Sequence, residues 1–144
     1  MRVFRVPIRI ASTAHPEVAR ELQAVVDTGS AYTLVPRTVA EALGIRPIRR
    51  MEARLANGTR TVRDMGEAVV TIEEMRTTTW VVFGEPEDAV LLGAVTLQEL
   101  ALEVDPTAER LRPAEVYMFG AAWTVPGVTR PTPRARSVPP TPAA

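Results

Sequence analysis

An acidic residue, Asp27, follows the apolar residues Leu22, Ala24, Val25 and Val26 and opens the tetrapeptide Asp-Thr-Gly-Ser. A second strand-like run, residues 31–35, follows directly after it. A carboxylate in this position can act as a general acid or base, and the neighbouring glycine allows the backbone to approach it closely. Asp27, Thr28 and Gly29 are therefore the candidate catalytic residues.

Other chemistries have less support from the sequence. Aspartate and glycine are also common turn formers, so the same tetrapeptide is compatible with a plain turn. His15 is the only histidine, and a triad of His15, Ser30 and an acid has no support from spacing. The chain has no cysteine, which excludes a thiol nucleophile and disfavours a metal site. We expect no cofactor and no metal.

The sequence around Asp27 resembles the active-site signature of the retropepsin-like aspartic proteases, the retroviral type with a single motif. Leu91-Leu92-Gly93 resembles the apolar-apolar-glycine strand that, with a short helix after it, forms the floor of the catalytic loop in that family. Asn57-Gly58 lies where the family carries the flap that closes over substrate. The resemblance covers about residues 3–106 and is that of a cellular, prokaryotic member.

This resemblance implies a homodimer, because a single motif supplies one aspartate and a two-fold axis places Asp27 opposite its own copy. Two carboxylates forced together share one proton. The ionised one can then take a proton from water while the protonated one donates to the scissile carbonyl. The implied function is an aspartic endopeptidase acting on peptides or proteins. The alternative is a catalytically idle dimer of the same fold that binds peptides or serves as an assembly module.

The resemblance also implies individual roles. The Gly29 amide donates to the carboxylate, Thr28 bonds across the two-fold axis, and the Ser30 hydroxyl donates toward the carboxylate pair. Substrate-binding residues are expected in the catalytic loop, the flap and the floor strand: Ser30, Ala31, Ala56, Asn57, Gly58, Leu92 and Gly93.

Three features depart from the viral pattern. Ala31 and Ala94 stand where the viral enzymes have an acid and an arginine that pair to brace the site. Both partners are absent together, so no buried charge is left unpaired and a different brace is expected. The flap tip lacks a glycine-rich run. Residues 102–112 extend beyond the viral C-terminus, so the resemblance does not specify how the strands of the dimer sheet are arranged.

Short apolar segments with only two brief helices predict a mostly β domain. The resemblance specifies a small closed β-barrel with a flap hairpin and one or two short helices, one half of a symmetric homodimer. Residues 16–24 are compatible with a helix or a strand, and the resemblance favours the strand. Asn57-Gly58 predicts a tight type I′ hairpin, in which both residues have positive φ. Alternating apolar residues at 4–10 predict a strand, and Pro7 indicates an edge or terminal one. The other elements expected are strands at 31–35, 69–72, 80–83, 90–93 and 102–104, a helix at 38–43 closed by a left-handed cap at Gly44, and a helix at 96–100.

Composition predicts one domain with a tail. We assign residues 1–112 to the protease domain, 113–125 to an aromatic extension able to dock, and 126–144, with six prolines in nineteen residues, to a disordered tail. Lys+Arg and Asp+Glu are both 17, so no net charge attracts nucleic acid or membrane. The N-terminus lacks a signal-like apolar run, and no segment reaches the ~18 apolar residues of a membrane span. We expect a cytoplasmic protein.

Overall fold

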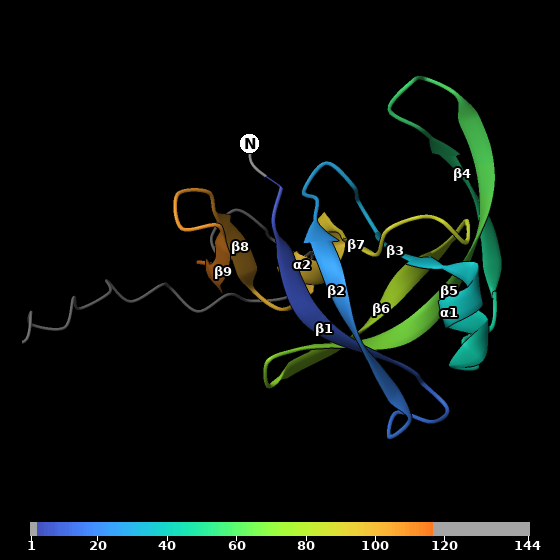
Figure 1. The fold of residues 1–144 in the computed structure, drawn as a ribbon, viewed down its shortest axis with the longest axis horizontal. Helices are drawn as coiled ribbons and strands as arrows, with labels where there is room; N and C mark the ends of the chain where they lie inside the picture. Colours follow the sequence, from blue (N-terminus) through green and yellow to red (C-terminus); the bar gives the residue numbers. More distant parts are fainter. Residues whose placement is uncertain (1–2, 117–144) are drawn as a thin grey trace, which may run out of the picture.

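A seven-stranded sheet dominates the computed structural model, which describes residues 3–116 (Figure 1). Its strands run in the order β1-β2-β7-β3-β6-β5-β4, and β1 also pairs with β5. The β1–β5 pairing closes the sheet into a barrel and leaves β4 attached only to β5. The strands are β1 (Arg5–Ser12), β2 (Ala19–Val26), β3 (Thr33–Pro36), β4 (Arg49–Arg54), β5 (Arg60–Ile72), β6 (Met75–Gly84), β7 (Leu91–Leu92), β8 (Leu102–Asp105) and β9 (Arg110–Pro113); the helices are α1 (Arg37–Ala42) and α2 (Ala94–Glu99).

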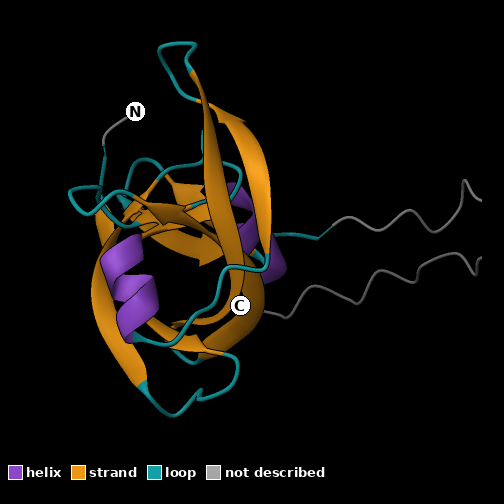
Figure 2. Ribbon diagram, turned by 90° about the vertical axis from the view of Figure 1, so that its right-hand side faces the viewer, coloured by secondary structure: helices purple, strands orange, loops and turns teal. Residues whose placement is uncertain are grey.

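The predicted mostly β, closed-barrel fold with two short helices is confirmed. The helices lie on different sides of the barrel (Figure 2). Alternating apolar residues of β1 point inward, and Ile10 lies opposite Val70 of β5 across the closing pair. Phe83 of β6 is the largest fully buried side chain. Each such side chain contributes about 1.5–3 kcal/mol through burial.

Residues 19–26 form a strand, which decides between the two alternatives for this segment. β2 pairs antiparallel with β1 along its length and parallel with β7 at its end. Local helix propensity is overridden because the strand gains hydrogen bonds on both sides. Pro7 was expected to mark an edge strand, but β1 is paired on two sides. The proline is tolerated because β5 pairs only with residues 9–12, so that Pro7 has a single neighbouring strand.

Helix α1 ends at Ala42, and Gly44 forms the predicted left-handed cap after it. This glycine has φ +76°, and its N–H donates to the Glu41 carbonyl. The next amide, from Ile45, donates to Ala40, which completes the double hydrogen bond of a Schellman cap. The cap turns the chain back toward β4.

The chain after α2 forms a separate two-stranded sheet of β8 and β9. The sequence did not predict β9. It pairs antiparallel with β8, and Val104 and Leu111 pack against the edge of the core. Most of the aromatic extension, and the whole segment 126–144, lie outside the described residues. Neither described helix is long and apolar enough to cross a membrane.

Candidate active site

Asp27 begins a short loop between β2 and β3. Its backbone N–H donates to the Leu92 carbonyl of β7 at 3.0 Å, and its own carbonyl accepts from the Ser30 amide at 3.1 Å. As the sequence predicted, the Gly29 amide donates to Asp27 Oδ1, at 3.0 Å. A Cβ on Gly29 would lie 3.2 Å from that oxygen, closer than an ordinary contact. Glycine therefore allows the amide to reach the carboxylate.

The β7–α2 junction supports this loop from below. The Ala94 amide donates to the Ser30 carbonyl at 2.8 Å, and the Val95 amide donates to the Ala31 carbonyl at 2.9 Å. Gly93 packs so tightly against the loop that a Cβ there would lie 2.4 Å from the Tyr32 carbonyl carbon. Backbone amides thus provide the different brace that was expected.

The β4–β5 hairpin rises from the barrel (Figure 1), and its turn differs from the prediction. Only Gly58 has positive φ, +84°; Asn57 does not, so the type I′ assignment was wrong. The Gly58 amide donates to Leu55, and Leu55 donates to Thr59. This is the pattern of a three-residue loop with a glycine bulge. The Asn57 side chain accepts from the Thr59 amide at 2.9 Å and steadies the tip.

The base of this hairpin is held by arginines. Asp64 of β5 accepts from Arg37 of α1 at 2.7 Å and lies 3.4 Å from Arg50 of β4. The hydrogen bond from Arg37 is the main cause that lowers the pKa of Asp64 below its usual value. Arg49 stacks over Trp80 of β6, 5.0 Å from the ring centroid. Residues 60–64 of β5 pair only with β4, so the hairpin is a two-stranded arm outside the barrel. The contacts of Arg37, Arg50 and Arg49 orient this arm.

A cleft of about 840 Å³ lies between the Asp27 loop and the hairpin. Its floor and far wall come from β3, β6, β7 and the loop that precedes β7. The cleft is lined by Asp27, Gly29, Ser30, Ala31, Tyr32, Leu34, Met51, Glu52, Ala53, Arg54, Leu55, Ala56, Thr61, Arg63, Val82, Asp88, Ala89 and Leu91. A carboxylate at the mouth of a largely apolar cleft under a β-hairpin can act on a bound extended chain.

Comparison with known proteins identifies the fold family. Residues 19–99 match the model of the family described as "gag-polyprotein putative aspartyl protease". The chain belongs to this family. The aspartyl protease match spans the Asp27 loop, the β4–β5 hairpin and the whole of α2. The chain is also similar to the simian foamy virus (mac) protease in solution, with 23% identity and a TM-score of 0.49, covering 67% of this chain and 94% of the other. No curated protein matches the sequence.

Within this aspartyl protease site, the predicted catalytic residues lie together. Asp27 and Gly29 line the cleft, while Thr28 is exposed at the surface of the loop. The role of Thr28 across a two-fold axis stays a prediction.

The Ser30 hydroxyl does not face the carboxylate as expected. It donates to the Tyr32 carbonyl at 2.9 Å. A hydroxyl carries one hydrogen, so the Ser30 side chain has none left for Asp27 in this arrangement. The Ser30 side chain therefore stabilises the backbone of the loop between β2 and β3.

The predicted substrate-binding residues are only partly brought together. Ser30, Ala31 and Ala56 line the cleft; Asn57 and Gly58 lie at the hairpin tip, and Leu92 and Gly93 lie beneath the loop, all four outside the lining. Their part in binding substrate stays a prediction.

Several lining residues were missed by the sequence analysis. Met51 and Ala53 could have been found from the period-two pattern of β4, which turns alternate side chains to one face. Leu34 and Val82 are opposite each other in the parallel β3–β6 pair. Nothing local marks Asp88, whose position depends on the loop before β7.

The other carboxylates of the cleft have structural partners. Glu52 pairs with Arg60 across the hairpin, 3.3 Å apart. Asp88 accepts from the Glu85 amide at 2.7 Å and so closes its own loop. Among residues 3–116, no three His, Asp or Glu side chains gather as a metal site would require. Asp27 and Asp88 are thus both engaged by a backbone amide of their own loop, and Asp27 is the one that stands in the predicted Asp-Thr-Gly motif.

Proposed function

We propose that the protein is a homodimeric aspartic endopeptidase in which Asp27 and its copy activate a water molecule. The observation that carries this proposal is the placement of Asp27. Its carboxylate opens onto the cleft, accepts from the Gly29 amide, and lies in a loop whose next two residues are exposed. A second chain can approach there, whereas Glu52 is paired with Arg60 and Asp88 lies in a different loop, outside the Asp-Thr-Gly motif.

The chemistry needs two such carboxylates. Because their negative charges repel at short range, the pair holds one proton between them and titrates as a unit. The ionised carboxylate accepts a proton from the attacking water, and the protonated one donates to the carbonyl oxygen of the scissile bond. This step requires no covalent intermediate with the protein.

The cleft favours an extended peptide with apolar side chains. Leu34, Val82 and Leu91 line its barrel side, and Met51 lines its hairpin side. An extended chain lying between the Asp27 loop and the hairpin would present alternate side chains to these two walls. We therefore expect cleavage next to apolar residues.

The test is incubation of the full chain with an unbiased peptide library from pH 3 to 8, with wild type compared with Asp27→Asn. The amide is nearly isosteric but cannot act as the base, so kcat should fall on the order of 10²–10⁴-fold. The thermal midpoint should be unchanged or slightly higher, because a like-charge pair is relieved. Specific activity should also fall on dilution as the dimer dissociates. An Asp27→Asn variant that cleaves like wild type would refute the mechanism.

A second candidate is an idle dimer that binds peptides without cleaving them. The observation that favours it is the loss of the charged brace at Ala31 and Ala94. The same library separates the two candidates, because an idle dimer would retain peptides by equilibrium binding while leaving every one intact.

A further inference from the structure

Three buried threonine hydroxyls form a chain directly behind the Asp27 loop. Thr33 of β3 and Thr96 of α2 are fully buried, and Thr79 of β6 is 3% exposed. Their Oγ1 atoms lie 2.7 Å apart for Thr33 and Thr96 and 3.5 Å apart for Thr96 and Thr79. Thr79 then donates to Glu99 Oε1 at 2.6 Å, and Thr77 donates to the other carboxylate oxygen at 3.1 Å. The chain therefore runs from the core to a carboxylate at the end of α2.

The carboxylate gives this chain one direction. An ionised carboxylate only accepts, so the single hydrogen of Thr79 points to Glu99. The Thr79 oxygen is then left to accept from Thr96, and Thr96 in turn accepts from Thr33. The Thr33 oxygen keeps a lone pair for the Gly93 amide, which donates to it at 3.1 Å. Every hydroxyl in the chain has a partner in this arrangement alone.

The inner end of the chain supports the catalytic aspartate. Gly93 follows Leu92, whose carbonyl accepts the Asp27 amide at 3.0 Å. Gly93 also precedes Ala94, whose amide holds the Ser30 carbonyl. The Asp27 loop is thus positioned by its hydrogen bonds to the β7–α2 junction. The junction in turn is held against β3 by the hydrogen bond from the Gly93 amide to Thr33.

We propose that Glu99 is a positioning residue for Asp27, acting through Thr79, Thr96 and Thr33. This inference rests on the proposed protease function. Without the carboxylate, the Thr79 hydrogen can turn toward Thr96, and the Thr96 hydrogen toward Thr33. In that reversed direction the Thr33 hydrogen has no acceptor among the three threonines, and in the original direction the Thr79 hydrogen has none, so one buried donor is unpaired in either case. Where the unpaired donor is that of Thr33, its relief requires the Thr33–Gly93 contact to rearrange.

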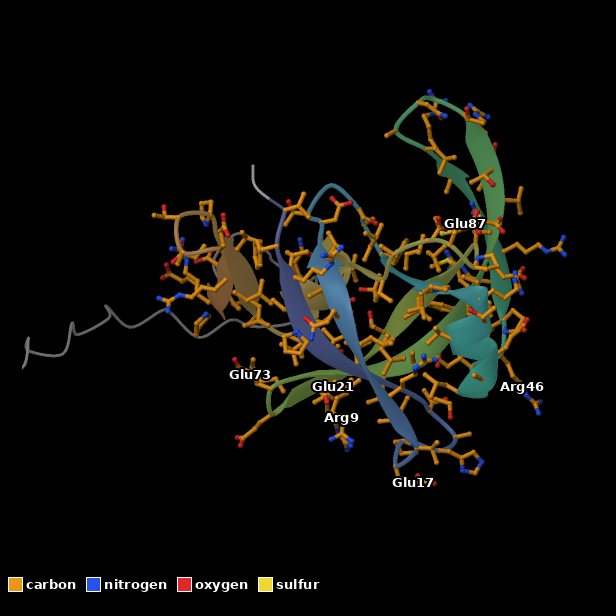
Figure 3. The ribbon with its side chains drawn as sticks, in the orientation of Figure 1. Arg9, Glu17, Glu21, Arg46, Glu73 and Glu87 are labelled. Atoms are coloured by element: carbon orange, nitrogen blue, oxygen red, sulfur yellow. The ribbon has the colours of Figure 1, made fainter. Side chains whose placement is uncertain are left out.

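The first test compares Glu99→Ala with Glu99→Gln. The glutamine oxygen still accepts from Thr79, so Glu99→Gln should retain wild-type kinetics. Glu99→Ala should lower kcat on the order of 10-fold with KM unchanged, because the loop that holds the base is displaced while the cleft walls are not. The matched control is Glu17→Ala, which removes an exposed carboxylate at the end of the barrel opposite the hairpin (Figure 3). It should leave both constants unchanged.

The second test does not depend on activity. Hydrogen exchange measured by NMR should show faster exchange of the Gly93 and Asp27 amides in Glu99→Ala, and wild-type rates in Glu99→Gln. The Ile45 amide, which donates to the Ala40 carbonyl in the α1 cap, should not change. Thr79→Val breaks the chain without touching the carboxylate and should give the same local change. The double variant Glu99→Ala with Thr79→Val should change the exchange rates no more than either single variant, because both substitutions break the same series of hydroxyl hydrogen bonds.

The outcomes separate the two hypotheses. Absence of cleavage by wild type refutes the protease function, while the exchange rates still decide the role of Glu99. Wild-type kcat together with wild-type exchange in Glu99→Ala would overturn the inference and leave the protease function standing. An equal loss in Glu99→Gln would assign the effect to charge alone and would also overturn it.

Discussion

Gly93→Ala should move the catalytic loop, because no space exists for a side chain at this position. The added Cβ would lie 2.4 Å from the carbonyl carbon of Tyr32, 2.5 Å from its oxygen and 2.9 Å from the Ala31 oxygen. Ordinary carbon contacts are about 3.5–4.0 Å, so the loop and the β7–α2 junction must separate by about 1 Å. Both partners at the clash are backbone, and neither can rotate away.

This displacement has two measurable consequences. Overpacking of this kind costs about 1–3 kcal/mol, which corresponds to a drop in the thermal midpoint of about 4–12 °C for a domain of this size. A shift of about 1 Å in a catalytic group lowers the rate on the order of 10²-fold. We expect kcat/KM for a cleaved peptide to fall by that factor. The amide resonance of Asp27 should shift as well, which reports loop movement independently of catalysis.

Gly44→Ala is the matched control for this prediction. Gly44 has a backbone conformation that favours glycine, φ +76°, but unlike at Gly93 no atom lies within 4 Å of a Cβ built there. Its substitution should cost about 1 kcal/mol through backbone strain alone. The thermal midpoint should fall while kcat/KM stays at the wild-type value. If Gly93→Ala behaves like Gly44→Ala, with lower stability and unchanged kcat/KM, the reasoning about loop support is refuted.

Three further predictions concern side chains and the tail. Ser30→Ala should leave the acidic limb of the pH–rate profile in place, because the hydroxyl donates to Tyr32; a displaced limb would show that it faces the carboxylates in the dimer. Arg37 lowers the pKa of Asp64 below 3.8, so this carboxylate contributes stability above that pH and the contribution is lost as pH falls through the lowered value. Thermal midpoints of Asp64→Asn should therefore depend less on pH below about 4 than those of wild type, and equal slopes would contradict the role of this ion pair. Removal of 126–144 should change the free energy of unfolding by less than about 1 kcal/mol, and a larger loss in a denaturant titration would place this segment in the folded domain.

Local patterns were enough to predict most elements of the barrel. Strand β2 was predicted through the family resemblance, because residues 16–24 were locally compatible with a helix as well. Alternating apolar residues marked β1, and Gly44 marked the end of α1. These signals are readable because each depends on residues that are close in the chain. Strand β3 begins at Thr33, later than predicted, because the Ala31 carbonyl accepts from the Val95 amide of α2 instead of from a neighbouring strand.

The remaining features depend on contacts between distant segments. Barrel closure by β1 and β5 leaves no local trace in either strand, and the turn at Asn57-Gly58 follows from the register that pairs Arg54 with Arg60. A one-residue difference in that register would change the turn type with the same sequence. The threonine chain could not be found either, since its members come from three elements and threonine is common in strands.

The brace behind the active site illustrates why a local sequence pattern cannot show how the site is supported. A charged brace has two recognisable residues, and their absence at Ala31 and Ala94 is visible at once. Its replacement consists of backbone amides from Ala94 and Val95 that donate to the loop, which any residue except proline can supply. Such a neutral brace requires no desolvation of a buried ion pair. It also does not titrate, so it holds the loop equally well across the acidic range in which a carboxylate pair would operate.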